Sequence, residues 1–144
     1  MTHSVNVAVI DWPASQTALA AAVQAAQAMG VRVNVALVDA SGVLAGFMRM
    51  PGAPLHSIDI AIDKAYTSAS FGLPTARWTE VLQSHSVAVR EGLVQRPRFV
   101  AFGGGVPIVE DGRCIGAIGV SGGSEQQDEQ IARAGLVALG LAQD

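Results

Sequence analysis

Cysteine, charge and aromatic side chains are all scarce in this sequence. The one cysteine, Cys114, excludes an internal disulfide and any metal site built from several cysteines. Only 15% of the 144 residues are charged, whereas about 25% are charged in a typical soluble domain. Because large bare apolar patches are rare on monomers, an uncharged surface of this extent predicts a homo-oligomer.

Several classes of partner are not expected. The nine Lys and Arg residues are scattered and the net charge is -3, so no basic stripe is available for nucleic acid. Aromatic residues make up 5% of the chain, too few for base-stacking platforms. Residues 1–13 lack the pattern of a signal peptide, and polar residues interrupt the longest apolar region, 14–29. We therefore expect no membrane association and a cytoplasmic location.

The length of the chain and its helix and strand signals indicate one α/β domain over residues 1–144. Asp11 is a good N-cap for a first helix, and Gly30 suits the left-handed residue that ends it. Ser57 is the expected cap of a second helix, Thr75 is a candidate cap for a less regular one, and Ser124 with Gln127 has capping-box spacing. The expected helices span residues 12–29, 58–71, 75–84 and 125–141.

Two hairpins are predicted between these helices. Apolar runs flank the turn signals 39–42 and 110–113, so residues 31–50 and 106–121 each form two antiparallel strands. Residues 97–105 are expected to be a short strand or a loop. Strands joined by tight turns cannot be parallel neighbours, which excludes a doubly wound dinucleotide fold.

The stretch IGAIGVSGGSEQQD, residues 115–128, resembles the beginning of a phosphate-binding loop. No Gly-Lys-Ser/Thr follows, and the glycine spacing is not that of the dinucleotide fingerprint. Its glycines are better interpreted as letting a strand lie close to a helix before a sharp turn. The amides of Gly122 and Gly123 at the following helix start are candidates for receiving a carboxylate.

Three blocks of sequence resemble a known family. They are VDASGVLAGFMRMPGA, SIDIAIDKAYTSASFGLPT and GGGVPIVEDGRCIGAIGVSGGSEQQDEQIARAG, and they are similar to the GlcG/HbpS family, which includes the C-terminal domain of PduO-type proteins. The resemblance covers residues 31–139. It implies a profilin-like sandwich with a largely antiparallel five-stranded sheet, assembling as dimers and often octamers.

The same resemblance implies less about function. Some members of the family bind heme, and many occur in catabolic gene clusters, so heme is a candidate cofactor. Members commonly have Arg-Met-Asp-Gly-Ala where this chain has Pro51 in place of the aspartate. The contact that the aspartate makes is therefore in question here.

Three charged residues are candidates for binding or chemistry. Lys64 lies in a helix rich in Ala, Ile and Ser, where an ammonium reaches water along the helix surface, holds an anion, or pairs with Asp63 or a neighbouring subunit. Arg49 has a planar fork suited to a carboxylate, with a salt bridge to Asp59 as the alternative. Asp128 lies in the first turn of the last helix, where it stabilises the helix dipole, acts as a base or holds Lys64.

Other candidates are histidines and one threonine. None of His3, His56 and His85 has HxxxH or HExxH spacing, so no zinc site is predicted. His56 and His85 are each either a heme or ligand contact or an ordinary surface histidine, and His85 could act as an acid or base. Thr67 shares a helical face with Lys64 that either meets water or lines a cavity.

Two functions remain open from the sequence. The first is an oligomeric binding protein that holds heme or another compact anionic ligand near the glycine loops. Its candidate ligand-binding residues are Arg49, His56, Lys64, Thr67, Gly122 and Gly123. The second is an enzyme of the isomerase or lyase/hydratase type that acts on a small carboxylated metabolite. Its acid and base candidates are Lys64, His85 and Asp128.

Overall fold

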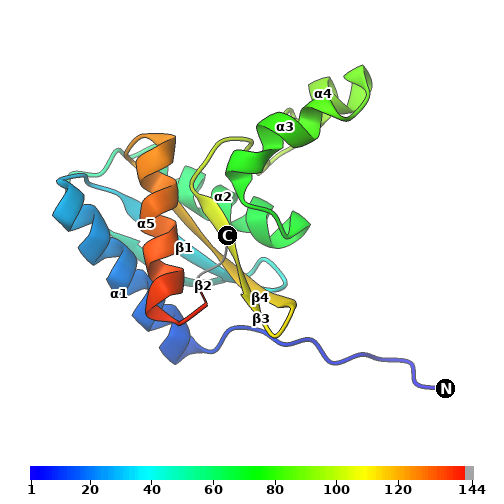
Figure 1. The fold of residues 1–144 in the computed structure, drawn as a ribbon, viewed down its shortest axis with the longest axis horizontal. Helices are drawn as coiled ribbons and strands as arrows, with labels where there is room; N and C mark the ends of the chain where they lie inside the picture. Colours follow the sequence, from blue (N-terminus) through cyan, green and yellow to red (C-terminus); the bar gives the residue numbers. More distant parts are fainter. Residues whose placement is uncertain (142–144) are drawn as a thin grey trace.

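Helices cover both faces of a four-stranded antiparallel sheet in the computed structural model, which describes residues 1–141 (Figure 1). The helices are α1 (Trp12–Met29), α2 (Ser57–Phe71), the short 3-10 helix η1 (Thr75–Arg77), α3 (Trp78–Gln83), α4 (Val87–Leu93) and α5 (Glu125–Ala138). The strands are β1 (Asn34–Asp39), β2 (Leu44–Arg49), β3 (Gly105–Glu110) and β4 (Arg113–Ser121).

The sheet has the order β2-β1-β4-β3, with every neighbouring pair antiparallel. Helices α1 and α5 pack together on one face, and α2 packs on the other. The three layers give the sheet two separate apolar interfaces. Both predicted hairpins are present, so an α/β fold with a helix-flanked antiparallel sheet is confirmed.

The interface under α1 and α5 holds most of the hydrophobic core. Branched residues from β1, β3 and β4 meet alanines of α1 and larger residues of α5 there, and removal of this apolar surface from water is the main force that holds the layers together. Its sheet residues are Val35, Leu37, Val106, Ile108, Ile118 and Val120, with Val33 just before β1, and its α5 residues are Ile131, Ala132 and Leu136.

The interface under α2 is built from small residues. Ala61 and Ala65 of α2 lie against Ala36, Val38 and Ala117 of the sheet. A Cβ added to Gly119 would lie 2.1 Å from the backbone oxygen of Ala61, and one added to Gly105 would lie 2.4 Å from that of Lys64. Glycine therefore lets the strands approach the helix backbone, as predicted for the run around residues 115–123.

The helix ends follow their capping signals in three places. The Asp11 side chain accepts the Trp12 amide at the start of α1, and Gly30 ends that helix at φ 74°. Ser124 and Gln127 form the predicted capping box of α5. Local hydrogen bonding thus positions α1 and α5 before tertiary packing is considered.

Other expectations were wrong in detail. Four strands are present within residues 1–141 rather than five, because residues 97–104 form a loop. Helix α2 begins at Ser57, so His56 rather than Ser57 is its cap residue, and the Ser57 hydroxyl instead accepts a hydrogen bond from Ser121. The expected helix at 75–84 is split into η1 and α3, and Thr75 accepts the Gly105 amide instead of capping it.

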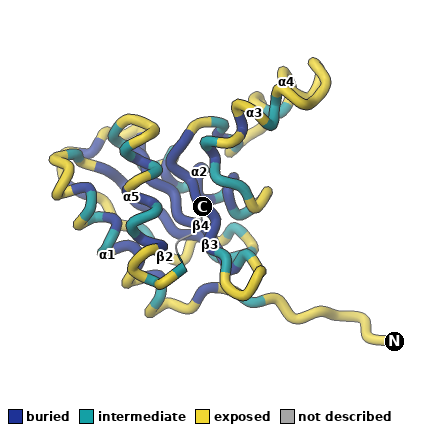
Figure 2. Tube along the Cα trace, viewed as in Figure 1, coloured by how far each residue is buried: buried dark blue, intermediate teal, exposed yellow. Residues whose placement is uncertain are grey.

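Helices α3 and α4 form an arm that projects from the three layers (Figures 1 and 2). No residue of α4 is buried, and this helix was not predicted. The arm is anchored at its base by Trp78, whose ring makes edge-to-face contacts with Phe71 and Phe99 at centroid distances of 4.7 and 4.9 Å. Among residues 1–141, no helix has both the length and the apolar character that a membrane crossing requires.

Candidate functional site

A buried ion pair joins two of the predicted site residues. Lys64 of α2 and Asp128 of α5 are 64 positions apart, and the Lys64 Nζ donates to Asp128 Oδ2 at 3.0 Å. The same ammonium donates to the Val120 carbonyl of β4 at 2.8 Å. Their side chains are only 1% and 3% exposed. The pair therefore ties together α2, β4 and α5 at the end of the sheet from which the last helix starts.

The second carboxylate oxygen of Asp128 orders the glycine turn. Asp128 Oδ1 accepts the Gly123 amide at 2.9 Å, so the amide that was expected to receive a carboxylate receives one from its own chain. The Phe102 ring lies over Lys64 Nζ, with 5.0 Å between the nitrogen and the ring centroid. A Cβ on Gly104 would lie 2.6 Å from Nζ, so a larger side chain there would displace the lysine.

The surroundings change the acidity of Lys64. Burial lowers the pKa of its ammonium below the usual 10.5, because the charged form loses hydration. The nearby Asp128 carboxylate opposes this shift through its charge and hydrogen bond, and Glu125 opposes it through its charge. Desolvation is the larger effect. Because the pair has almost no solvent access, its observed role is to connect secondary-structure elements.

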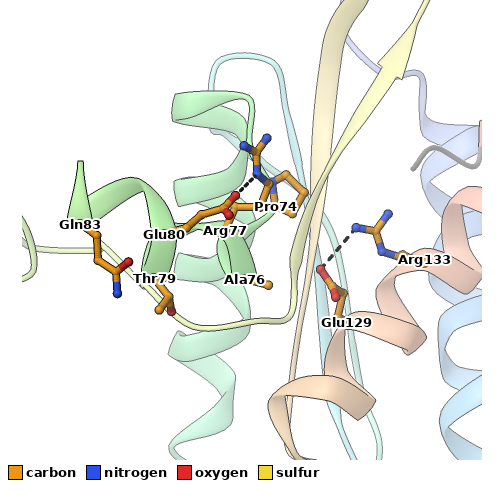
Figure 3. A pocket seen from close by; sticks show the side chains of 8 residues that line it. All are labelled: Pro74, Ala76, Arg77, Thr79, Glu80, Gln83, Glu129 and Arg133. Atoms are coloured by element: carbon orange, nitrogen blue, oxygen red, sulfur yellow. Dashed lines mark hydrogen bonds and ion pairs between the residues drawn. The ribbon is translucent and has the colours of Figure 1, made fainter. Parts of the chain in front are cut away.

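An open groove of about 470 Å³ lies between the arm and α5 (Figure 3). Pro74, Ala76, Arg77, Thr79, Glu80 and Gln83 form one wall, and Glu129 and Arg133 form the other. The arginines carry an acidic partner on their own wall: Arg77 pairs with Glu80 at 3.1 Å and Arg133 with Glu129 at 3.4 Å. The groove thus presents one guanidinium from each wall.

The groove and the buried pair are neighbours. A Cβ on Gly103 would lie 3.4 Å from the Ala76 Cβ of one wall and 3.1 Å from the Glu125 carbonyl at the start of α5. Gly103 precedes the glycine that lies against Lys64, and Asp128 precedes Glu129 in the other wall. Residues 102–104 of the loop before β3 therefore separate the open groove from the closed Lys64–Asp128 pair.

Three other predicted residues lie away from this pair. Arg49 ends β2, where Nη1 donates to Asn34 Oδ1 and Nη2 to the Ala53 carbonyl, rather than to Asp59. His56 is exposed at the start of α2. His85 is exposed in the arm between α3 and α4. The structure thus brings Lys64, Asp128 and Gly123 together and leaves the two histidines elsewhere on the surface.

The remaining two predicted residues have structural contacts. The Thr67 hydroxyl donates to the Arg98 carbonyl and accepts the Val100 amide. It therefore holds the segment that follows α4 against α2. Gly122 has φ 144°, and a Cβ there would lie 2.4 Å from the Arg32 carbonyl. Asp63, one suggested partner of Lys64, pairs instead with Arg98 at 3.1 Å.

The groove arginines were missed by reasoning from the sequence. Arg77 lies in a segment without clear periodicity, and Arg133 lies in a helix where an i,i+4 pair with Glu129 is an ordinary surface feature. Only the turn of the chain at Pro74 and the packing of α5 bring the two walls together. Within residues 1–141, no three His, Cys, Asp or Glu side chains gather as metal ligands would.

Comparison with known proteins identifies the family. The model of the haem degrading protein HbpS-like family matches residues 10–137. The chain belongs to the HbpS-like family. This match confirms the resemblance inferred from the three sequence blocks, and it spans the sheet, the glycine turn, the groove and most of α5.

This chain is similar to members of the family both in sequence and in structure. The corrinoid adenosyltransferase PduO of Salmonella typhimurium is 36% identical over 121 residues, which cover 84% of this chain but 36% of PduO. The crystal structure of Klebsiella pneumoniae protein ORFY is 32% identical, with a TM-score of 0.89 and 99% of each chain covered. The PduOC:heme complex is 34% identical, with a TM-score of 0.82 and coverage of 90% of this chain and 94% of PduOC.

Proposed function

We propose that this protein is an oligomeric binding protein for heme or another compact anionic ligand, held in the groove between the arm and α5. The observation that carries the proposal is the placement of Arg77 and Arg133 on opposite walls of one cavity. Two guanidiniums facing a common space suit a ligand with two carboxylates, because each planar fork can donate two parallel hydrogen bonds.

The size of the groove supports the same proposal. Small-molecule sites usually enclose about 300–1,000 Å³, and the groove has about 470 Å³. Ion pairs with Glu80 and Glu129 hold the two arginines beside the groove. A bound carboxylate would take over part of this hydrogen bonding, at modest cost because exposed ion pairs contribute about 0–1 kcal/mol.

Heme would need two partners for its propionates and one residue to hold its iron. The two propionates would meet Arg77 and Arg133, and the residues that line the groove include no His, Cys, Met or Tyr to hold the iron. His85 lies two positions beyond the lining residue Gln83 and is exposed. We therefore assign the iron contact to His85. When bound, heme would supply an iron centre for redox or oxygen chemistry.

Support for binding over acid–base catalysis comes from the positions of the three catalytic candidates. Lys64 and Asp128 are 1% and 3% exposed and are bonded to each other, whereas His85 is in the arm. A general base must reach the proton it removes from the substrate. The exposed residues of the groove need no such rearrangement to contact a ligand.

Hemin titration tests the proposal. The wild-type chain should develop a Soret band that co-elutes with protein in gel filtration, and Arg77→Ala/Arg133→Ala should weaken hemin binding at least tenfold because both carboxylate partners are lost. His85→Ala should shift the Soret maximum by removing the iron ligand. Titrations at fixed protein concentration, followed by absorbance, give the affinities.

Matched variants distinguish this groove from the other predicted location. Arg113→Ala removes an exposed arginine at the β3–β4 turn, and His3→Ala removes an exposed histidine; both should bind hemin like the wild type. If Arg49→Ala or His56→Ala abolishes binding while the groove variants do not, the ligand lies at the end of β2. If hemin elutes apart from the wild-type chain, the heme proposal fails, and dicarboxylates become the next ligands to test.

A further inference from the structure

Residues 4–10, SVNVAVI, form a strand-like segment without a neighbouring strand. Val5, Val7 and Val9 alternate with smaller or polar residues and are 86%, 64% and 51% exposed. Figures 1 and 2 show the first part of this segment running away from the three layers as an exposed extended chain, whereas Ala8 is half-buried and Ile10 is buried in the core. Its β-branched, period-two pattern and its lack of Lys, Arg, Asp and Glu are typical of a strand that pairs with another.

The segment has no room to extend a ladder along β4, the strand that it meets at Ile10. The Ile10 amide donates to the Ile115 carbonyl of β4 at 2.9 Å, which fixes the point where the segment leaves the body. From Gly116 onward, this side of β4 is occupied by β1, through the pair Asp39↔Gly116. In the other direction β4 ends at Arg113. Strand β4 therefore offers no further room for residues 4–9.

One edge of the sheet is closed to an added strand. Strand β3 contains Pro107, which has no amide to donate. The Gly105 amide of the same strand already donates to the Thr75 hydroxyl at 2.9 Å. Proline and a covering side chain are two ways in which proteins protect sheet edges.

The other edge, β2, is open. The Met50 amide donates to the Val33 carbonyl, and the pair Val35↔Met48 continues this ladder, so the backbone groups of Phe47 and Arg49 point away from β1. No hydrogen bond to those backbone groups occurs within residues 1–141. The strand contains neither proline nor lysine, and its Leu44 and Met48 side chains are 47% and 46% exposed.

We propose that residues 4–9 of one copy pair with the outer edge of β2 in a second copy. Each copy contains an unpaired strand and an open edge with matching backbone groups, and apart from Arg49 at the end of β2 the side chains on both are uncharged. Reciprocal exchange closes a dimer with two such contacts. This strand pairing is separate from the ligand groove, so the result of a hemin-binding experiment neither supports nor contradicts it.

Cross-linking between two singly substituted proteins tests the pairing. In a Cys114→Ser background, Val7→Cys and Met48→Cys chains are mixed, allowed to exchange subunits and treated with a short bis-maleimide. A product joining residue 7 of one chain to residue 48 of the other is expected. The matched control replaces Met48→Cys with Thr17→Cys, an exposed position on α1, and should give no product with Val7→Cys.

Other products would overturn the proposal. A Met48→Cys chain that links only to itself would show that two β2 edges pair directly, and the absence of any product would show that the segment does not reach β2. A second measurement uses sedimentation of Val7→Pro, which loses an amide donor, and Val7→Thr, which keeps a β-branched strand former. The mass of the assembly should fall for Val7→Pro alone; equal masses for Val7→Pro and wild type would contradict the pairing.

Discussion

The burial of Lys64 and Asp128 carries an electrostatic cost that their hydrogen bonds must offset. Removing two charges from water costs several kcal/mol per ion, and the pair compensates through its own attraction and through bonds to Val120 and Gly123. Each oxygen of the carboxylate has a different partner. Loss of either charged group would leave the other one buried, so the two residues depend on each other.

The lowered pKa of Lys64 gives a pH dependence with a definite sign. Between the folded-state pKa and 10.5, the unfolded chain binds a proton that the folded chain does not. The free energy of unfolding should therefore rise with pH across that window, and this contribution is absent below the folded-state pKa. The double variant Lys64→Met/Asp128→Asn lacks both charges, so its free energy of unfolding serves as the reference without this contribution.

Urea unfolding from pH 7 to 10.5 measures this contribution. The wild-type free energy of unfolding minus that of the double variant should increase with pH, because other titrating groups largely cancel in the difference. A difference that falls toward high pH would mean that the Asp128 charge outweighs desolvation and raises the pKa of Lys64.

At the scale of elements, the separation between α2 and the sheet is set by glycine. An alanine at Gly119 would place its Cβ 2.1 Å from the Ala61 oxygen and 2.5 Å from the Ala65 nitrogen. Both atoms belong to the helix backbone, so they cannot move aside as a flexible side chain could. Helix α2 would have to shift, and Lys64 would shift with it.

Gly119→Ala should therefore lower the free energy of unfolding by about 1–3 kcal/mol or more, the range for overpacked cores. Gly92→Ala is the matched control, because a Cβ at Gly92 in α4 has no heavy atom within 4 Å. Alanine there should leave stability unchanged or raise it by up to about 1 kcal/mol. Equal unfolding midpoints in urea for the two variants would contradict this account of the α2 interface.

The elements that could be predicted from the sequence are those with local signals. Asp11, Gly30 and the Ser124–Gln127 box act on backbone groups a few positions away, and the hairpin turns act within four residues. Ser57 misled the prediction because a partner 64 positions away, Ser121, takes its hydroxyl. The fold class was therefore accessible, while the exact start of α2 depended on tertiary contact.

The difference between local signals and tertiary contacts also explains how much of the candidate site could be predicted. Asp128 was suggested as a holder of Lys64 from its position in the first turn of the last helix, at the end of the glycine loop, and the pair exists. The groove could not be predicted, because Arg77 and Arg133 carry no shared motif and meet only when the arm folds beside α5. Sites between elements distant in sequence require the fold.

At the scale of the whole molecule, the groove joins two parts of unequal stability. Its α5 wall belongs to the buried core through Ile131 and Leu136. Its α3 wall belongs to the arm, in which Trp78 is buried but the neighbouring α4 buries no residue. Regions with few buried contacts open more readily than the core. A ligand bound to both walls would therefore stabilise mainly the arm.

Hydrogen exchange with and without hemin measures this asymmetry. Without ligand, the amides of α4 should exchange much faster than those of β4. With hemin, protection should increase in η1 and in α3, which follows it directly, because Arg77 of η1 becomes linked through the ligand to Arg133 on a rigid helix, while α1 on the far side of α5 should remain unchanged. Arg77→Ala/Arg133→Ala should show no such increase. Protection gained in α2 or β2 but not in α3 would place the ligand outside the groove, since only a molecule held by both walls restrains the arm.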